Sequence, residues 1–98
     1  MPRPGYTYIM TNKPHGVLYT GVTAYLAERI DQHRGGRGSA FCRRYGLNRL
    51  VLVEQHDSIE HAIAREKALK AWRREWKIQL IEAAKAEWDD LFDRIAWG

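Results

Sequence analysis

One carboxylate occupies a helical position where a core residue is expected. Residues 59 to about 71 have the spacing of a helix, and on that helix Glu66 falls between Ile63 and Ala62, inside the apolar sector. Burying an unpaired charge is costly, so a carboxylate in this sector needs a cation or several hydrogen-bond donors beside it. Two interpretations follow. Glu66 either forms a structural ion pair, with Lys70 one turn further on or with an arginine of another element, or it binds a metal or acts in acid/base chemistry.

Two other pairs of residues could take part in chemistry, but each has an ordinary structural alternative. Arg29 and His33 lie four residues apart in another expected helix, so their side chains share one face. An arginine can grip a phosphate and a histidine can move a proton near neutral pH, yet taken alone such a pair is typical of a solvated surface. Tyr8 and Tyr19 belong to two neighbouring expected strands, where aromatic pairs commonly stabilise a sheet without any further role.

The first half of the chain contains the elements that must position the tyrosines, Arg29 and His33. β-Branched and aromatic residues predict a β-hairpin, and a short amphipathic helix follows it and ends at two glycines. After this helix the sequence predicts a basic, glycine-punctuated loop with one helical turn. The expected segments are strands within 6–10 and 16–23, a turn at 12–16, a helix over 24–34, and a loop over 35–46 with its helical turn at 41–45.

The second half of the chain contains the helix that carries Glu66. An apolar run at 50–55 predicts a third strand, and its unbroken apolar character favours a central position in the sheet. Asp57 or Ser58 can cap the following helix, and a further helix is expected over 74–85, before a short amphipathic turn. The order β-β-α-β-α-α predicts an α/β (α+β) fold, in which helices pack on a small three-stranded mixed sheet that begins with the hairpin.

Length and composition limit the class of protein. With 98 residues the chain forms one domain, spanning 1–98 with a core at about 6–81 and a C-terminal helical tail at 82–98. No apolar run approaches the roughly 18 residues that cross a bilayer, and no signal peptide is recognised. Cys42 is the only cysteine, which excludes an intramolecular disulfide and a cysteine-based zinc site. We therefore expect a cytoplasmic protein without membrane contact.

The charges are unevenly distributed along the chain. The net charge is +4, and the stretch 34–49 contains five arginines and no acid, whereas 82–93 contains five acids and one lysine. A basic stretch of this kind indicates a polyanionic partner. The acidic C-terminal segment carries apolar side chains that either pack into the core or form a contact with a partner protein or a second copy of the chain, namely Trp88, Leu91, Phe92, Ile95 and Trp97.

Taken together, the tyrosines, Arg29 and His33 resemble the GIY-YIG nuclease superfamily. Its first motif is a strand that ends in tyrosine and its second is a strand that carries Tyr-x-Gly, which match Tyr6-Thr7-Tyr8 and Tyr19-Thr20-Gly21. Ten residues separate Tyr8 from Tyr19, which is the usual spacing. The superfamily then places an arginine eight residues beyond the glycine and a histidine or tyrosine four further on, and these positions are Arg29 and His33.

The metal-binding glutamate of the superfamily matches Glu66. The surrounding sequence, 65–73, is similar to that of small stand-alone bacterial members, which resemble the N-terminal nuclease domain of the excision-repair endonuclease. The likeness spans about 6–81. Tyr6 replaces the first motif glycine, a substitution familiar among the small members. An asparagine that some members carry after the glutamate has no counterpart here, so its role is unassigned.

The resemblance implies an enzyme, a metal-dependent endonuclease that hydrolyses the phosphodiester bonds of nucleic acid, with DNA favoured over RNA and a role in DNA repair. It implies that Tyr19 is the general base or its relay, that Tyr8 positions it, and that Arg29 clamps the phosphate. His33 would donate to the phosphate or share the base role. Glu66 would hold one Mg²⁺ or Mn²⁺, a cation that accepts a single protein carboxylate and completes its shell with water and phosphate.

Other basic and aromatic residues would contact the nucleic acid outside the cleaved bond. The backbone contacts are expected from Arg34, Arg37, Arg43, Arg44 and Lys70. Lys70 could also neutralise Glu66 in the empty enzyme, and Phe41 and Tyr45 either stack on an exposed base or anchor their loop. Two other functions stay open: a non-catalytic nucleic-acid-binding module with the same fold, and a protein whose basic loop binds an acidic partner.

Overall fold

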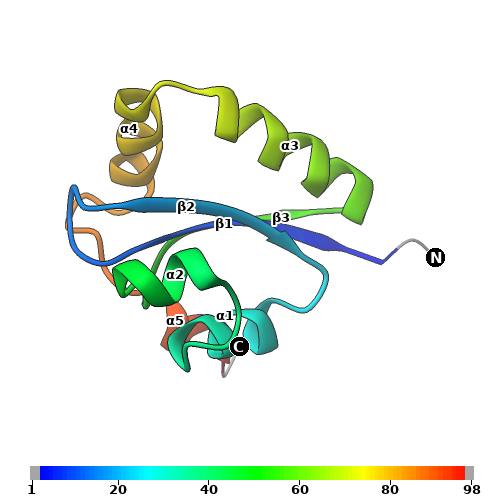
Figure 1. Ribbon diagram of the computed structural model, residues 1–98. Helices are drawn as coiled ribbons and strands as arrows, with labels where there is room; N and C mark the ends of the chain where they lie inside the picture. The colour runs from blue at the N-terminus through cyan, green and yellow to red at the C-terminus, as the bar shows by residue number, and fades with distance from the viewer. Residues whose placement is uncertain (1–2, 97–98) are drawn as a thin grey trace.

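The computed structural model describes residues 3–96 (Figure 1). It confirms the expected α+β class and element order, and it resolves the helical turn in the basic loop as a short helix. The elements are β1 (Gly5–Thr11), β2 (Leu18–Thr23), α1 (Leu26–Arg34), α2 (Ala40–Tyr45), β3 (Arg49–His56), α3 (Ile59–Ala71), α4 (Arg74–Ala84) and α5 (Phe92–Ala96). Within this part of the chain, none of the helices combines the length and apolarity needed to cross a membrane.

The strand order in the sheet is β2-β1-β3, and both pairings are antiparallel. The expectation of a mixed sheet was wrong in this detail. β2 and β3 do run in the same direction, as strands joined by a helical crossover should, but β1 lies between them and pairs with both. The expectation that β3 is central was also wrong, because β1 holds that position. The apolar run of β3 reflects burial of its first half, where Leu50, Val51 and Leu52 are buried, whereas Gln55 is exposed.

Helices cover both faces of the sheet (Figure 1). On one face α1, α2 and α5 surround a core cluster that includes Tyr8, Met10 and Ile30. On the other face α3 and α4 cover a second cluster that includes Ile9 and Leu69. Successive residues of β1 therefore point into opposite cores, since side chains alternate across a strand.

The glutamate-bearing helix α3 is fixed at its first turn. Ser58 is the N-cap, and its hydroxyl accepts a hydrogen bond from the amide of His61, so one of the two predicted caps is confirmed. The hydroxyl of Thr7 donates to the carbonyl of Ala62 at 2.8 Å, and the helix packs so closely on Gly5 that a Cβ there would lie 2.7 Å from the Cα of Ile59. These contacts set where the rest of α3, including Glu66, crosses the sheet.

The C-terminal segment packs against the core of its own chain. Trp88 is buried in the second core cluster, and Leu91, Phe92 and Ile95 pack against the first. Of the two interpretations of these side chains, the structure shows core packing. Trp97 lies outside the described residues.

The carboxylate of Asp90 holds this segment in place. It accepts hydrogen bonds from the amides of Leu50 and Phe92 and from the guanidinium of Arg34. Burial acts to raise the pKa of Asp90, but these hydrogen bonds outweigh it, so the pKa lies below its usual value.

Candidate active site

The glycine of the Tyr-x-Gly motif lies directly beneath a tyrosine ring. In the β1–β2 ladder Tyr8 pairs with Gly21, whereas Tyr19 pairs with Met10. A Cβ at position 21 would lie 2.5 Å from the Oη of Tyr8, closer than any real contact, so only glycine fits there. The two tyrosines are thus diagonal neighbours on one face of the sheet, with their ring centroids 6.5 Å apart.

Tyr8 and His33 form a buried hydrogen-bonded pair. The Oη of Tyr8 lies 2.8 Å from Nε2 of His33, and the exposed fractions of the two residues are 1% and 3%. His33 is therefore not the solvated residue that its position alone suggested, because α1 ends against the sheet and the loop at Gly38 covers the ring. A Cβ at Gly38 would lie 2.7 Å from Nδ1 of His33, so a side chain at this position would clash with the imidazole and only glycine fits.

The pKa values of this pair keep both side chains neutral near pH 7. Burial raises the pKa of Tyr8 well above its usual value, and the Arg29 guanidinium opposes this shift without cancelling it. Burial, assisted by the positive charge of Arg29, lowers the pKa of His33 to about 4. The imidazole is therefore uncharged, and its Nδ1 has no hydrogen-bond partner among residues 3–96.

Arg29 supplies the positive charge next to this pair. Its guanidinium donates to the side chain of Gln32 at 3.2 Å and lines an open cavity of about 290 Å³ together with Tyr25 and Glu28. No ion pair engages Arg29 among the described residues. An arginine without a carboxylate partner, held beside two neutral groups, is suited to bind an anion such as a phosphate.

Of the two motif tyrosines, Tyr19 is the one that reaches the surface. Its ring contacts His33 edge-on at a centroid distance of 5.4 Å and Phe41 at 6.0 Å. It also lines a second open cavity of about 290 Å³ at the free edge of β2. Because Tyr8 is buried and Tyr19 is not, only Tyr19 can contact a bound molecule without a rearrangement of the core.

Glu66 comes from the opposite layer of the protein. Helix α3 covers the face of the sheet away from α1, so Glu66 does not approach the site from the same side as Tyr8, Tyr19, Arg29 and His33 (Figure 1). Its side chain is 14% exposed, which agrees with the inward position on the helix, and one carboxylate oxygen lies 3.1 Å from Nζ of Lys70. Lys70 in turn lines the cavity that Tyr19 lines. One lysine side chain therefore connects Glu66 with the edge of β2 where Tyr19 is exposed.

The donor groups around Glu66 fit only a sparsely ligated cation. Within residues 3–96 no group of three or more histidine, cysteine or acidic side chains is placed to hold a metal ion. A single carboxylate suits Mg²⁺ or Mn²⁺ when water and a substrate phosphate complete the shell, but it does not suit an all-protein site. Glu66 supplies one such carboxylate, and Lys70, whose Nζ lies 3.1 Å from it, would have to move aside for the cation.

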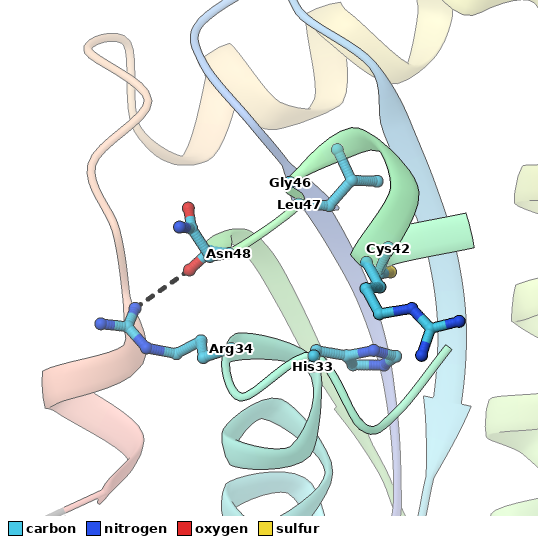
Figure 2. Close-up of a pocket in the computed structure, with 8 residues that line it drawn as sticks. His33, Arg34, Cys42, Gly46, Leu47 and Asn48 are labelled. Carbon is cyan, nitrogen blue, oxygen red and sulfur yellow. Dashed lines mark hydrogen bonds between the residues drawn. The ribbon is translucent and has the colours of Figure 1, made fainter. Parts of the chain in front are cut away.

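The predicted phosphate-contacting arginines divide into two groups. Arg34 is engaged by the chain itself, because it donates to Asp90 at 2.6 Å and to the carbonyl of Asn48 at 3.0 Å and stacks on Phe92. Figure 2 shows Arg34 and His33 leaving the end of α1 in opposite directions around a small cavity of about 110 Å³. All four arginines are exposed, but Arg37 meets only Asp31, at 3.4 Å, among the ion pairs of residues 3–96, and Arg43 and Arg44 on α2 form no ion pair there.

Two residues near the site were missed by the sequence analysis. Gly38 covers His33, and Lys77 lines the Tyr19 cavity beside Lys70. The spacing of Lys77 carried no signal, because α3 and α4 are separate helices and the angle between them decides which side chains converge. The sequence analysis identified a glycine-punctuated loop here, but nothing in it indicated which glycine would contact an imidazole.

Comparison with known proteins tests the resemblance found in the sequence. The GIY-YIG catalytic domain matches residues 4–79 of the chain. A UPF0213 protein of Clostridium perfringens is 37% identical over 78 residues, covering 80% of this chain and 83% of the relative. A UPF0213 protein of Haloquadratum walsbyi is 35% identical over 77 residues, covering 79% and 85%.

A solved structure extends the likeness to three dimensions. The solution NMR structure of a UPF0213 protein from Bacillus halodurans has a TM-score of 0.51 and 34% sequence identity to this chain, and the match covers 82% of this chain and 84% of the other. The resemblance drawn from the tyrosine motifs is therefore confirmed. The chain belongs to the GIY-YIG catalytic domain family, a nuclease superfamily, and within it to the UPF0213 proteins.

Proposed function

We propose that this protein is a metal-dependent endonuclease that hydrolyses phosphodiester bonds of DNA. The observation that carries the proposal is the buried Tyr8–His33 pair. It lies beside Arg29, which has no carboxylate partner within residues 3–96, and next to Tyr19, which lines a cavity. Neutral proton-carrying groups next to an unpaired cation suit a reaction that moves a proton while a phosphate stays bound.

Tyr19 is the general base or its relay, since it is the tyrosine that lines the cavity. Tyr8 and His33 act through it as positioning residues. Tyr8 is fully buried and its phenol keeps its proton, while the imidazole of His33 contacts both tyrosine rings and shares a hydrogen bond with the phenol of Tyr8. A neutral, buried imidazole fits this positioning role and disfavours His33 as a charged phosphate contact.

Arg29 clamps the scissile phosphate. A guanidinium can donate to two phosphate oxygens at once and keeps its charge at every pH of interest. The hydrogen bond from Arg29 to the side chain of Gln32 is exposed, so a phosphate oxygen can replace it. Because Arg29 already acts on the pKa values of Tyr8 and His33, a phosphate that neutralises it would also change the proton affinity of the pair.

Glu66 holds a divalent cation, Mg²⁺ or Mn²⁺, which when bound would offset the charge that develops on the phosphoryl oxygens. In the empty protein Lys70 neutralises the carboxylate across 3.1 Å. Lys70 is more than half exposed, so it can turn from Glu66 towards a substrate phosphate at little cost. This exchange of partners accounts for an inward-facing carboxylate whose one ion pair within residues 3–96 is with a half-exposed lysine.

The exposed arginines Arg37, Arg43 and Arg44 contact the nucleic-acid backbone outside the cleaved bond, together with Lys70. Arg34 does not belong to this set, because Asp90, Asn48 and Phe92 already engage its guanidinium. Contacts to phosphates add affinity that depends on salt and carry no sequence information. The single, buried cysteine is compatible with a reaction in the reducing cytoplasm.

The test is a cleavage assay on supercoiled, branched and single-stranded DNA and on RNA, with Mg²⁺ or Mn²⁺ and with a chelator. Glu66→Gln and Arg29→Ala should each lower the rate at least about 100-fold. Matched controls are Glu60→Gln on the same helix and Arg94→Ala on α5, which should keep the wild-type rate. Cleavage that survives both site substitutions would exclude the assignment.

The alternative function is a non-catalytic nucleic-acid-binding module. It is favoured by the position of Glu66, which comes from the layer opposite to Tyr8 and is already paired with Lys70 at 3.1 Å. In that case the wild-type protein binds DNA in a salt-dependent way but cuts none of the substrates under any metal condition.

A further inference from the structure

The cavity at the free edge of β2 is larger than the proposed chemistry needs. It measures about 290 Å³ and is lined by side chains from β2, α2, α3 and α4: Leu18, Tyr19, Thr20, Phe41, Lys70 and Lys77. The hydrolytic site uses Tyr19 and, through Glu66, Lys70. The volume is close to the lower limit of about 300 Å³ for pockets that bind small ligands, so the cavity can receive a group the size of a nucleotide unit.

One wall of the cavity is an exposed aromatic ring. Phe41 is 43% exposed, although its ring packs on Tyr19 at 6.0 Å and on Tyr45 at 4.9 Å. These two contacts hold Phe41 in place and leave part of its surface uncovered. An aromatic ring that is fixed by neighbouring rings and half open to solvent is a suitable platform for a flat apolar group.

The opposite wall of the cavity carries two lysines whose positive charges are balanced by one carboxylate among the ion pairs of residues 3–96. Lys70 and Lys77 converge on the cavity from α3 and α4, and burial, followed by the charges of Arg74 and Lys70, lowers the pKa of Lys77. Lys77 has no salt bridge within residues 3–96, and Lys70 has only Glu66. An anion bound between the two lysines would relieve their repulsion.

We propose that this cavity binds the nucleotide next to the cleaved phosphodiester bond, with its base stacked on Phe41 and its phosphate between Lys70 and Lys77. The inference rests on the proposed nuclease function, because Tyr19 forms part of both the cavity and the hydrolytic site. The aromatic ring of Phe41 matches the base of a nucleotide, and the two lysines match its phosphate. Nucleic acids are the common biological polymers in which every unit carries both an aromatic group and an anionic group.

The geometry implies that the bound nucleotide is unpaired. Inside a duplex both faces of a base are covered by its neighbours, so a base that stacks on Phe41 must leave the stack. The preferred substrate is therefore a single strand, a frayed end or a branch point, in DNA or in RNA. The two polymers share this chemistry, and the experiment distinguishes them.

The test measures binding in the Glu66→Gln protein, which removes cleavage from the readout. The probes are labelled eight-unit oligothymidylate, oligouridylate, and an eight-unit deoxyribose-phosphate chain without bases, measured by fluorescence anisotropy. Phe41→Ala should weaken binding of the probes with bases about tenfold and leave the baseless probe unchanged. Lys77→Ala should weaken binding of all three. Trp76→Ala, an exposed aromatic on α4, and Lys67→Ala, an exposed lysine on α3, are the controls.

The outcomes separate the two proposals. Equal effects of Phe41→Ala on probes with and without bases, or no effect on either, would overturn the stacking site even if the wild-type protein cuts DNA. If binding depends on the bases through Phe41 but the protein cuts no substrate, the stacking site is supported and the proposed nuclease function is excluded. Circular dichroism and thermal unfolding of each variant show whether a loss of binding is due to misfolding. If Phe41→Ala misfolds, Phe41→Leu replaces it, because leucine keeps the apolar volume without the aromatic ring.

Discussion

The phenolic oxygen of Tyr8 lies 2.8 Å from Nε2 of His33, and both side chains are almost completely buried. The hydrogen bond joins the central strand to the end of α1, across 25 positions of the sequence. It places both side chains next to the ring of Tyr19, which the imidazole of His33 contacts edge-on.

The ring of His33 should titrate near pH 4. The unfolded chain takes up the imidazole proton near pH 6.5, whereas the folded chain does so near pH 4. Between these values the unfolded state binds more protons, so this residue stabilises the fold above about pH 6.5 and its contribution is lost as the pH falls towards 4. An NMR titration of the ring protons measures the pKa directly. A midpoint near 6.5 would contradict the buried, neutral imidazole, and His33→Gln should reduce the dependence of unfolding on pH in this window.

Gly21→Ala should destabilise the fold by about 1–3 kcal/mol, because the new methyl group would meet the ring of Tyr8. The measurement is the free energy of unfolding in urea. Gly35→Ala is the control, since a Cβ there would have no neighbour closer than 3.4 Å and the φ angle of −83° suits alanine. Equal stability of the two variants would mean that Tyr8 does not lie over Gly21.

Tyr19→Phe should lower kcat about 100-fold and leave the affinity for DNA nearly unchanged. The reason is that the hydroxyl takes part in proton transfer while the ring keeps its contacts with His33 and Phe41. Tyr8→Phe should have a smaller effect, since its hydroxyl acts only through its neighbours. Single-turnover cleavage and DNA binding are measured side by side, with Tyr6→Phe as control. A larger loss for Tyr8 than for Tyr19 would reverse the two assigned roles.

Asp90→Ala should lower the free energy of unfolding by about 1–3 kcal/mol. The substitution leaves the amide of Leu50 and the guanidinium of Arg34 without their acceptor. Asp89→Ala removes a neighbouring carboxylate that meets Lys85 at 3.5 Å on the surface, and it should change stability by no more than about 0.5 kcal/mol. Thermal unfolding of the two variants compares them. If both behave alike, Asp90 does not anchor the C-terminal segment.

The sequence alone determined the features that depend on neighbours in the chain. Helix periodicity placed Glu66 inward, and the 14% exposure of its side chain agrees with this. Turn and cap residues predicted the hairpin and the start of α3. The spacing of Tyr8, Tyr19, Arg29 and His33 indicated the family, because strand and helix geometry translate fixed spacings into fixed positions within each element.

Only the tertiary structure decided which of these residues meet. The apolar run of β3 suggested a central strand, but pairing placed β1 in the centre, and no local pattern distinguishes the two. His33 has the spacing of a surface residue and is buried because α1 ends against Tyr8. Glu66 and Tyr19 lie in different layers and are linked through Lys70, and Lys77 joins Phe41 in one cavity across the edge of β2. These contacts depend on how whole helices pack on the sheet, and the energy that selects a packing arrangement is spread over many residues far apart in the sequence.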